Sequence, residues 1–571
     1  MKRNFIISTV SLAASMFLLG GCYSLDLAPD YQLSSGTFWQ TEDHARQGIV
    51  SVYQMLQNDN LTGMLFTEDI PGGICTGYDV DPRNLAVGTI NANSGYVSSK
   101  WSALYEGIAR ANSVIQNVTD MEIDAGIKNV VIGEAKFLRA YFYSMLLNYY
   151  GGVPYYDETC IVASEFSNML KPRSSADEIR TKVIADLDAA IAVLPDYKGT
   201  NDWSGSDYGR ATKGAAQALK AKVLLYNKKY ADAATLFKTI IDKGNYSLEP
   251  NYADIFLPGN GSGDEGPEMI FAVQNMGGVG SDFGMPFTFR MGTRSSFGSC
   301  WDNVTLATDF VDSYENLDGT PFNWEDWFPG FTTNDEVKKE VFLLQDKSGY
   351  LDPIRPAQLD KLLQMYETRD PRMAATIILP YTHYLGWASN AEKDMEYLIP
   401  ESGSGNETNG SIRVNNSWKV YLFRKFVATG NMGGLINNRA DTPINFPLIR
   451  YADVLLMYAE CLNETTGPDA AAPYVNMVRQ RAGMPDLKNV SDKASMFKAI
   501  QHERAVELVG EGHSYMDRRR WGTLEELDGK SAKDLIGGGL YTHKVLARDY
   551  LLPIPNGEIE KNSTLTQNTG W

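Results

Sequence analysis

Apolar positions recur at helical spacing over two stretches of the chain, residues 42–244 and 448–520. The clearest unit is 212–244, in which two apolar stripes flank the short polar turn 227–229. Positions three and four apart lie on one face of a helix, so each stripe predicts one amphipathic helix. The stripes consist of Ala215, Ala218, Leu219, Val223 and Tyr226, and then of Tyr230, Ala233, Ala234, Phe237, Ile240 and Ile241.

Small alanines that face one another let two such helices pack closely, and this unit therefore resembles a tetratricopeptide repeat. Residues 133–150 predict a further long helix. Residues 448–462 and 470–481 predict another helical pair, separated by Gly467-Pro468. A helix pair cannot bury its apolar face alone, so several pairs are expected to stack into a superhelical scaffold.

The stretch 258–444 differs, because it is rich in Gly, Asn, Pro and aromatic residues and has no long apolar stripe. Within it, Glu268-Met269-Ile270-Phe271 predicts a short strand. Long irregular segments in compact proteins usually carry function. We therefore expect a mostly α fold, with a tetratricopeptide-like helical-repeat scaffold, a large irregular, loop-rich ligand-binding part and a few short strands.

The first residues predict export and a lipid anchor. Lys2 and Arg3 precede the apolar segment 5–19, which is short for a membrane span and typical of a secretory signal. The segment ends in Leu19-Gly20-Gly21-Cys22, which resembles a bacterial lipobox. We expect residues 1–21 to be a lipoprotein signal peptide and Cys22 to be acylated, which would hold the chain on a membrane. The alternative is an ordinary signal peptide with an incidental cysteine.

Composition narrows the class of ligand. The chain of 571 residues has a net charge of −18, which would repel a polymer of phosphates and argues against nucleic acid as a partner. Its 10 Trp, 31 Tyr and 23 Phe suit a neutral ligand that stacks and forms hydrogen bonds. The remaining cysteines are scattered without a C-x-x-C pair, so we expect neither a disulfide framework nor structural zinc, and no cofactor.

An ordered set of motifs then makes the chain recognisable. The N-terminal motifs are Leu25-Asp26-Leu27-Ala28-Pro29, Phe38-Trp39-Gln40, Trp101-Ser102-Ala103-Leu104-Tyr105, Glu134-Ala135-Lys136-Phe137-Leu138-Arg139-Ala140-Tyr141 and Tyr150-Gly151-Gly152-Val153-Pro154. The C-terminal motifs are Arg369-Asp370-Pro371-Arg372, Arg450-Tyr451-Ala452-Asp453, Glu503-Arg504, Glu507-Leu508, Glu511-Gly512-His513, Arg519-Arg520-Trp521-Gly522 and Leu552-Pro553-Ile554-Pro555. Over nearly the whole mature chain, this order resembles the SusD/RagB family of outer-membrane lipoproteins of the Bacteroidetes.

The resemblance implies a non-catalytic lipoprotein on the extracellular side of the outer membrane. Such a protein binds an oligosaccharide and delivers it to a SusC-like TonB-dependent transporter, on which it sits as a lid. The resemblance also implies a single fold over residues 22–571, with an N-terminal region 22–257 and a C-terminal region 258–571. Some family members partner with peptide importers, so a peptide-binding lid is the alternative.

The sequence contains little that indicates an enzyme. Glu503, Glu507 and Glu511 lie one helical turn apart, and paired carboxylates are what a glycoside hydrolase requires. Arginines close in sequence, Arg504 and 518–520, would lower the pKa of these glutamates, which is unsuitable for a general acid. Gly261-Ser262-Gly263-Asp264-Glu265-Gly266 precedes a strand rather than a helix, so it is interpreted as a loop and not as a dinucleotide site.

Two regions combine aromatic rings with polar side chains, as a sugar site requires. The first is 76–96, where Tyr78 and Asp79 are the best candidates. The second is 283–331, which includes Phe283 and the candidates Trp301, Trp324 and Trp327. The alternative for this second cluster is a small hydrophobic core beneath a long loop. If it binds glycan, replacing Trp324 and Trp327 by alanine should weaken retention on a glycan gel without lowering the melting temperature.

Overall fold

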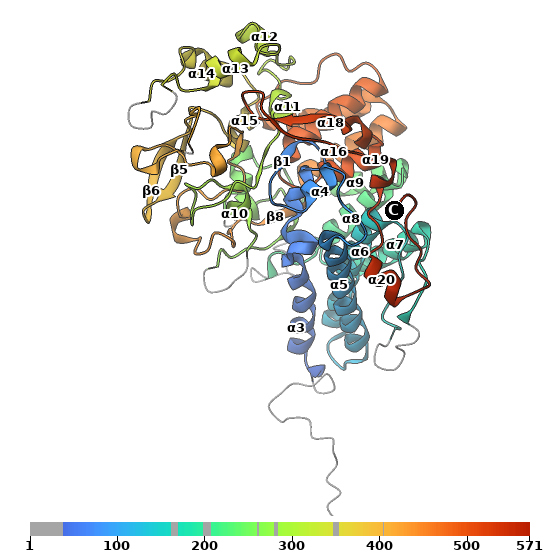
Figure 1. Ribbon diagram of the computed structural model, residues 1–571. Helices are drawn as coiled ribbons and strands as arrows, with labels where there is room; N and C mark the ends of the chain where they lie inside the picture. Colours follow the sequence, from blue (N-terminus) through green and yellow to red (C-terminus); the bar gives the residue numbers. More distant parts are fainter. Residues whose placement is uncertain are drawn as a thin grey trace, which may run out of the picture.

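The computed structural model describes residues 38–160, 169–197, 207–259, 262–278, 284–346, 353–403 and 405–571. The predicted signal peptide, Cys22 and Phe283 lie outside these residues. Figure 1 shows two parts in contact, a bundle of long helices and a part built of short helices, two-stranded sheets and loops. In the described ranges, no helix has the length and apolar character needed to cross a membrane.

The helical part is a succession of antiparallel neighbours. Helices that follow one another in sequence pack together, as do α16 with α9, α17 and α18. This is the mostly α, tetratricopeptide-like scaffold expected from the apolar stripes. Its members are α3 (Glu42–Tyr53), α5 (Gly95–Asp120), α6 (Ala125–Tyr150), α7 (Ala176–Val193), α8 (Lys213–Tyr226), α9 (Tyr230–Lys243), α16 (Tyr451–Thr465), α17 (Pro468–Arg481) and α18 (Lys493–Leu508).

The predicted unit 212–244 forms as expected. The Thr212 hydroxyl caps α8 by accepting a hydrogen bond from the Ala215 N–H at 3.1 Å. Gly244 ends α9 in the left-handed conformation, with φ of 67°. Ala215 and Ala218 are fully buried, and α8 packs against α9 along their length.

The predicted helix start at Leu448 is wrong. Phe446–Arg450 forms strand β8, which pairs antiparallel with β2 (Met269–Val273), and α16 begins only at Tyr451. All residues of both strands are buried. An apolar run buried on every side has no periodicity that separates a strand from a helix.

The other part of the molecule contains short elements between long loops. Each pairing between named strands is antiparallel, and each described sheet has two strands: β1 with β3, β2 with β8, β4 with β7, β5 with β6 and β9 with β10. The short elements are β1 (Cys75–Gly77), α4 (Pro82–Ala86), α10 (Phe287–Met291), β3 (Val304–Leu306), α11 (Thr308–Asp312), α12 (Trp324–Trp327), α13 (Asp335–Phe342), α14 (Leu359–Glu367), α15 (Pro371–Thr376), β4 (Ile377–Ile378), β5 (His383–Ala388), β6 (Ala391–Glu396), β7 (Leu422–Phe423), α19 (Ser514–Trp521), β9 (Ser531–Lys533), β10 (Gly539–Thr542) and α20 (Asn556–Lys561).

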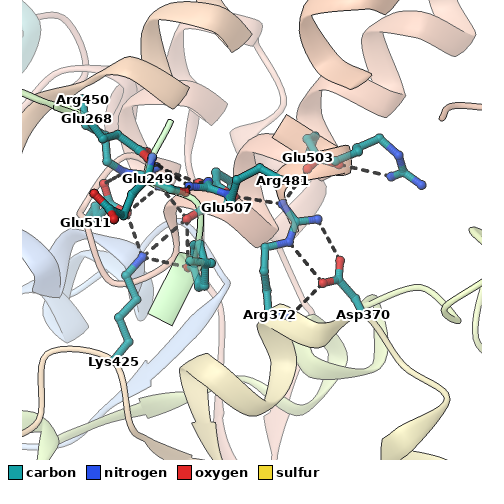
Figure 2. Close-up of polar contacts among 12 residues, drawn as sticks. Glu249, Glu268, Asp370, Arg372, Lys425, Arg450, Arg481, Glu503, Glu507 and Glu511 are labelled. Atoms are coloured by element: carbon teal, nitrogen blue, oxygen red, sulfur yellow. Dashed lines mark hydrogen bonds and ion pairs between the residues drawn. The ribbon is translucent and has the colours of Figure 1, made fainter. Parts of the chain in front are cut away.

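A buried network of ion pairs joins the loop-rich part to α18 (Figure 2). At the end of β8, the Arg450 Nη1 contacts Glu268 and Glu507 at 2.6 Å each. Arg372, in α15, contacts Glu507 at 3.0 Å, so one glutamate of α18 anchors both elements. All four side chains are essentially inaccessible to solvent. Removing one member of such a network leaves an uncompensated buried charge, which costs about 3–5 kcal/mol.

Candidate functional site

The pairing of β1 with β3 brings the two candidate loops of the sequence together. Gly77 lies opposite Val304 in the register, and the Tyr78 N–H donates to the Asn303 carbonyl at 2.8 Å. The Asn303 side-chain amide donates to the Tyr78 carbonyl at 3.1 Å, across 225 positions of sequence. Tyr78 and Asp79 therefore lie beside the segment that carries Trp301.

Tyr78 and Trp418 form an aromatic edge at this junction. Their ring centroids are 4.8 Å apart in an edge-to-face arrangement, and Tyr78 is 46% exposed. Trp418 was not a candidate from the sequence. It follows Asn415-Asn416-Ser417 in a polar loop, which is the same pattern that identified Trp301, so that pattern could have found it.

Asp79 lines a cavity of about 540 Å³ at the foot of this edge. Its φ of 52° is in the left-handed region, which aspartate tolerates better than most residues. The turn directs the chain from β1 into α4 and places several polar side chains around one space. The lining includes Asp59, Asn60, Met64, Thr67, Glu68, Tyr78, Asp79, Asp81, Arg83, Asn84, Tyr96, Lys100 and Arg290.

The inner end of the cavity is held by a buried ion pair. Lys100, from α5, contacts Glu68 at 3.3 Å, and the Tyr96 hydroxyl donates to the same carboxylate. Burial lowers the pKa of Lys100 and raises that of Tyr96, where the charge of Glu68 adds to the effect. Lys100 and Tyr96 both contact the Oε1 of Glu68, whereas its Oε2 is buried without a hydrogen-bond partner. Asp79 and Asp81 are exposed at the rim.

This arrangement suits a polar, uncharged ligand. Carboxylate and amide oxygens of Asp79, Asp81 and Asn84 can accept hydrogen bonds from hydroxyl groups, and the Arg83 guanidinium can donate them. The Tyr78–Trp418 edge offers apolar ring surface beside these groups, although the two rings are nearly perpendicular and a ligand would stack on one of them at a time. A sugar presents the same combination, with C–H groups on its faces and hydroxyls at its rim.

Trp301 extends the aromatic surface beyond the cavity. It is half-buried, and its ring lies 4.7 Å from that of Phe289. The Trp301 carbonyl accepts a hydrogen bond from the Asn415 side chain at 3.2 Å, which ties it to the loop of Trp418. Tyr78, Asp79 and Trp301 thus belong to one region of the molecule.

Trp324 and Trp327 lie elsewhere, on α12, which Figure 1 shows at the upper edge of the molecule, away from β1 and α4. For Trp324 the structure corrects the expectation of an exposed ring, because only 5% of the residue is accessible. Its ring stacks on Phe331 at 3.9 Å, and its indole N–H donates to Asp312 at 2.8 Å. This burial favours the alternative interpretation, a small aromatic core. Trp327 is half-buried against the same core.

The predicted row of three glutamates is helical only in part: Glu503 and Glu507 lie on α18, which ends at Leu508, and Glu511 lies in the turn beyond it. All three are fully buried and ion-paired. Nearby arginines lower the pKa of Glu507 and Glu511 against the opposing effect of burial, as expected from the sequence. The partners, however, are Arg372, Arg450, Arg479 and Arg481, not the arginines adjacent in sequence. Arg504 and Arg520 pair instead with Asp453, Asp517 and Glu460. A substrate has no access to this row of carboxylates.

A second, more apolar cavity of about 380 Å³ lies among α6, α8 and α19. Its charged groups are already engaged, because Lys222 pairs with Asp453 at 3.5 Å and Arg520 with Glu460. We therefore place the candidate site at the polar cavity beside Tyr78. The cysteines Cys75, Cys160, Cys300 and Cys461 are free thiols, and no group of potential metal ligands gathers among the described residues.

Comparison with known proteins agrees with this architecture. "SusD-like protein P25" of Formosa agariphila is 27% identical, over 97% of this chain and 97% of the relative. A SusD-like protein from Bacteroides fragilis superposes with a TM-score of 0.75 at 24% identity, covering 95% of this chain and 100% of that one. Surface glycan-binding protein A from Bacteroides thetaiotaomicron, solved in complex with laminarihexaose, superposes with a TM-score of 0.64 at 19% identity. The match covers 92% of this chain and 99% of that one.

Two family models match the chain itself. One, described as starch-binding and associating with the outer membrane, matches residues 24–225. The other, described as the SusD family, matches residues 267–571, which is more than half of the sequence. The chain belongs to the SusD family.

Proposed function

We propose that this protein is a non-catalytic surface lipoprotein that binds an oligosaccharide in the cavity beside Tyr78. The observation that carries the proposal is the meeting of an exposed aromatic edge, Tyr78 and Trp418, with a polar cavity of about 540 Å³. A glycan ring would stack on the edge, and its hydroxyls would bond to Asp79, Asp81 and Arg83.

Two further observations support a binding role. The structural neighbour solved with laminarihexaose shares this fold over most of both chains. Within the described residues, arginines enclose the carboxylates that suggested a hydrolase, which are Glu503 and Glu507 on α18 and Glu511 just beyond it. Binding without catalysis is thus the role that best fits the accessible chemistry.

The same proposal includes an anchor and a partner. Cys22 would carry the acyl chains that hold the protein on the extracellular side of the outer membrane, and a SusC-like TonB-dependent transporter would receive the glycan. The family model that associates its members with the outer membrane supports this location. The cavity lies at the N-terminal end of α5, where Tyr96 and Lys100 line it, so a transporter could contact other surfaces while the ligand is bound.

Calorimetric titration with laminarihexaose and maltoheptaose tests the binding site. Tyr78→Ala and Trp418→Ala should each weaken binding by at least about tenfold, since truncating a central aromatic contact typically costs 2 kcal/mol or more. Trp327→Ala removes a half-buried ring far from the cavity and is the matched control. Equal affinity of all three variants would exclude the Tyr78–Trp418 edge, and peptide binding in place of sugar binding would favour the peptide-importer alternative.

Purification of a tagged full-length chain from outer membranes tests the anchor and partner. A TonB-dependent transporter should co-purify, and Cys22→Ser should release the chain from the membrane fraction, whereas Cys75→Ser should leave it there. A Cys22→Ser chain that stays in the outer membrane would contradict the lipid anchor, and purification without a transporter would contradict delivery.

A further inference from the structure

Three arginines lie against the paired rings of Phe289 and Trp301, and the backbone of a fourth is bonded to one of them. The Arg439 guanidinium lies 4.5 Å from the centre of Phe289 and 5.7 Å from that of Trp301. Arg290 lies 4.9 Å from Phe289, and Arg294 lies 5.9 Å from Trp301. Arg413 joins them because its carbonyl accepts the Arg294 backbone N–H at 3.0 Å. Such a basic cluster is unexpected in a chain with a net charge of −18.

Few direct ion pairs compensate the charges of this cluster, although the Asp59 carboxylate, which lines the same cavity, interacts with the charge of Arg290. In the part of the chain that the structure describes, Arg290, Arg294 and Arg439 form no ion pair, and Arg413 contacts Glu407 only at 3.8 Å. The buried arginines near α18 differ, because each of them pairs with at least one carboxylate.

The carboxylate of Asp302, on which the charge of Arg294 acts, compensates this arginine only in part. Asp302 is fully buried, and this burial raises its pKa to about 7, so near neutral pH it is partly protonated. Its oxygens accept the backbone N–H of Asn415 at 3.1 and 3.3 Å, so Asp302 serves the loop backbone and forms no direct ion pair with arginine.

The guanidinium groups are also held in place before any ligand arrives. Arg439 donates to the Gly298 carbonyl at 2.8 Å, and Arg294 donates to the Asn415 side chain at 2.8 Å. Each uses one nitrogen for this contact, and a planar guanidinium with five N–H groups retains others. The Arg290 Nε is buried without a hydrogen-bond partner, although buried donors normally have one.

The cluster is continuous with the candidate cavity. Arg290 lines that cavity and reaches toward the Asn303 side chain, whose amide bonds to Tyr78. A chain molecule seated on Tyr78 and Trp418 can therefore extend over Phe289 and Trp301. The carboxylates Asp59, Asp79 and Asp81 lie at the cavity, so the two ends of this surface differ in charge.

We propose that the glycan carries carboxylate or sulfate groups, and that Arg290, Arg294 and Arg439 bind these groups above the Phe289–Trp301 pair. This inference rests on the proposed glycan-binding function and specifies its ligand. Uronic acids and sulfate esters share the planar or clustered oxygens that guanidinium groups bind through paired hydrogen bonds. An uncharged stretch of the same chain occupies the cavity beside Asp79 and Asp81.

The test uses the mature protein, calorimetric titration and three probes: laminarihexaose, a hexasaccharide of neutral sugars and uronic acids, and a partly sulfated galactan hexasaccharide. At least one anionic probe should bind. Arg294→Gln should lower the affinity for that probe by about tenfold or more, as expected for a lost charge-assisted hydrogen bond. Its affinity should also fall with added salt, since exposed charges are screened. If laminarihexaose binds, Arg294→Gln should change its dissociation constant by no more than about twofold, because a neutral sugar gains little from the charge of Arg294.

Arg355→Gln is the matched control, because Arg355 is an exposed arginine whose charge is already paired with Glu396. It should change no affinity, and Arg290→Gln offers a second test should Arg294→Gln unfold. Binding of laminarihexaose with no binding of either anionic probe would overturn the inference and leave the proposed function standing. Failure of all three sugars to bind would overturn the proposed function as well. The two anionic probes distinguish carboxylate from sulfate.

Discussion

The helical scaffold and the loop-rich part are held together in different ways. In α5 to α9, each helix packs on the next through periodic apolar stripes, and fully buried alanines such as Ala215 and Ala218 set the spacing. In the loop-rich part, short elements such as α15 and β8 meet α18 through buried ion pairs of Arg372 and Arg450.

This difference shows how a ligand surface can be built from irregular chain. Apolar packing tolerates many arrangements of similar volume, whereas a buried ion pair requires one geometry. The charged network fixes where the ends of the loops lie. The loops between those ends, such as 78–96 and 284–303, can then carry exposed rings and arginines without contributing much to stability.

Among the substitutions that test this comparison, replacing Arg450 should cause the largest loss of stability. Arg450→Met leaves Glu268, Glu507 and Glu511 without their shared partner, and we expect a loss of about 3–5 kcal/mol in the free energy of unfolding. Urea unfolding followed by tryptophan fluorescence measures it. Should the variant not fold, Glu268→Gln removes a single charge from the same network.

The control for Arg450 lies on the scaffold surface. Lys238 and Asp242 form an exposed pair one turn apart on α9, so Lys238→Ala should leave the free energy of unfolding nearly unchanged. Equal, small losses for Lys238→Ala and Arg450→Met would show that the buried network does not hold the loop-rich part.

Trp324→Ala should have the next largest effect and tests whether α12 belongs to a core. The buried ring stacks on Phe331, and Asp312 loses its indole donor, so we expect a loss of about 3 kcal/mol, at the lower end for a buried tryptophan. Trp327→Ala, at a half-buried position, should cost clearly less. Neither should alter glycan affinity. Weaker glycan binding by Trp324→Ala with an unchanged melting temperature would restore the sequence-based interpretation.

Acidification should change the free energy of unfolding less than either Arg450→Met or Trp324→Ala. Burial, with the charge of Lys222, lowers the pKa of His513 from 6.5 to about 4, so between these values the unfolded chain binds more protons. Stability from this residue is therefore lost as the pH falls, by roughly 2 kcal/mol between pH 7 and pH 5. His513→Gln should flatten the dependence of the urea midpoint on pH over this range.

Asp302, in the loop-rich part, provides a control of opposite sign. Its pKa is raised from 3.8 to about 7, so it destabilises the fold as the pH rises between these values. Asp302→Asn should remove this dependence of the free energy of unfolding on pH, and the gain in stability should be largest near pH 7. Identical pH profiles for the parent, His513→Gln and Asp302→Asn would exclude both effects.

Much of the scaffold could be predicted from the sequence because its signals are local. The stripes of 212–244, with Thr212 at the start and Gly244 at the end, identified α8 and α9 correctly. Strand β8 was misjudged because its partner β2 lies far away in the chain, and a fully buried strand leaves no alternation to detect.

The site could be predicted only in part, again because contacts between segments far apart in the chain decide which residues meet. Tyr78, Asp79 and Trp301 were identified by residue type, but their meeting depends on the pairing of β1 with β3. Trp324 has the same loop context as Trp301 and yet is buried, because Phe331 and Phe342 fold back onto it. Residue type indicates which rings could bind a sugar, while burial, which depends on distant segments, decides which of them can.

The long sequence separations in the charged network also order the events of folding. Glu268 can pair with Arg481 only after 213 further residues have been synthesised. Likewise, Arg372 can pair with Glu507 only after 135 further residues. Helices α5 to α9 contact their sequence neighbours and can form as soon as they emerge, because closing short loops costs little entropy. The part that carries the arginines and aromatic rings therefore closes only after α18 has been made, beside helices α5 to α9 that are already in place.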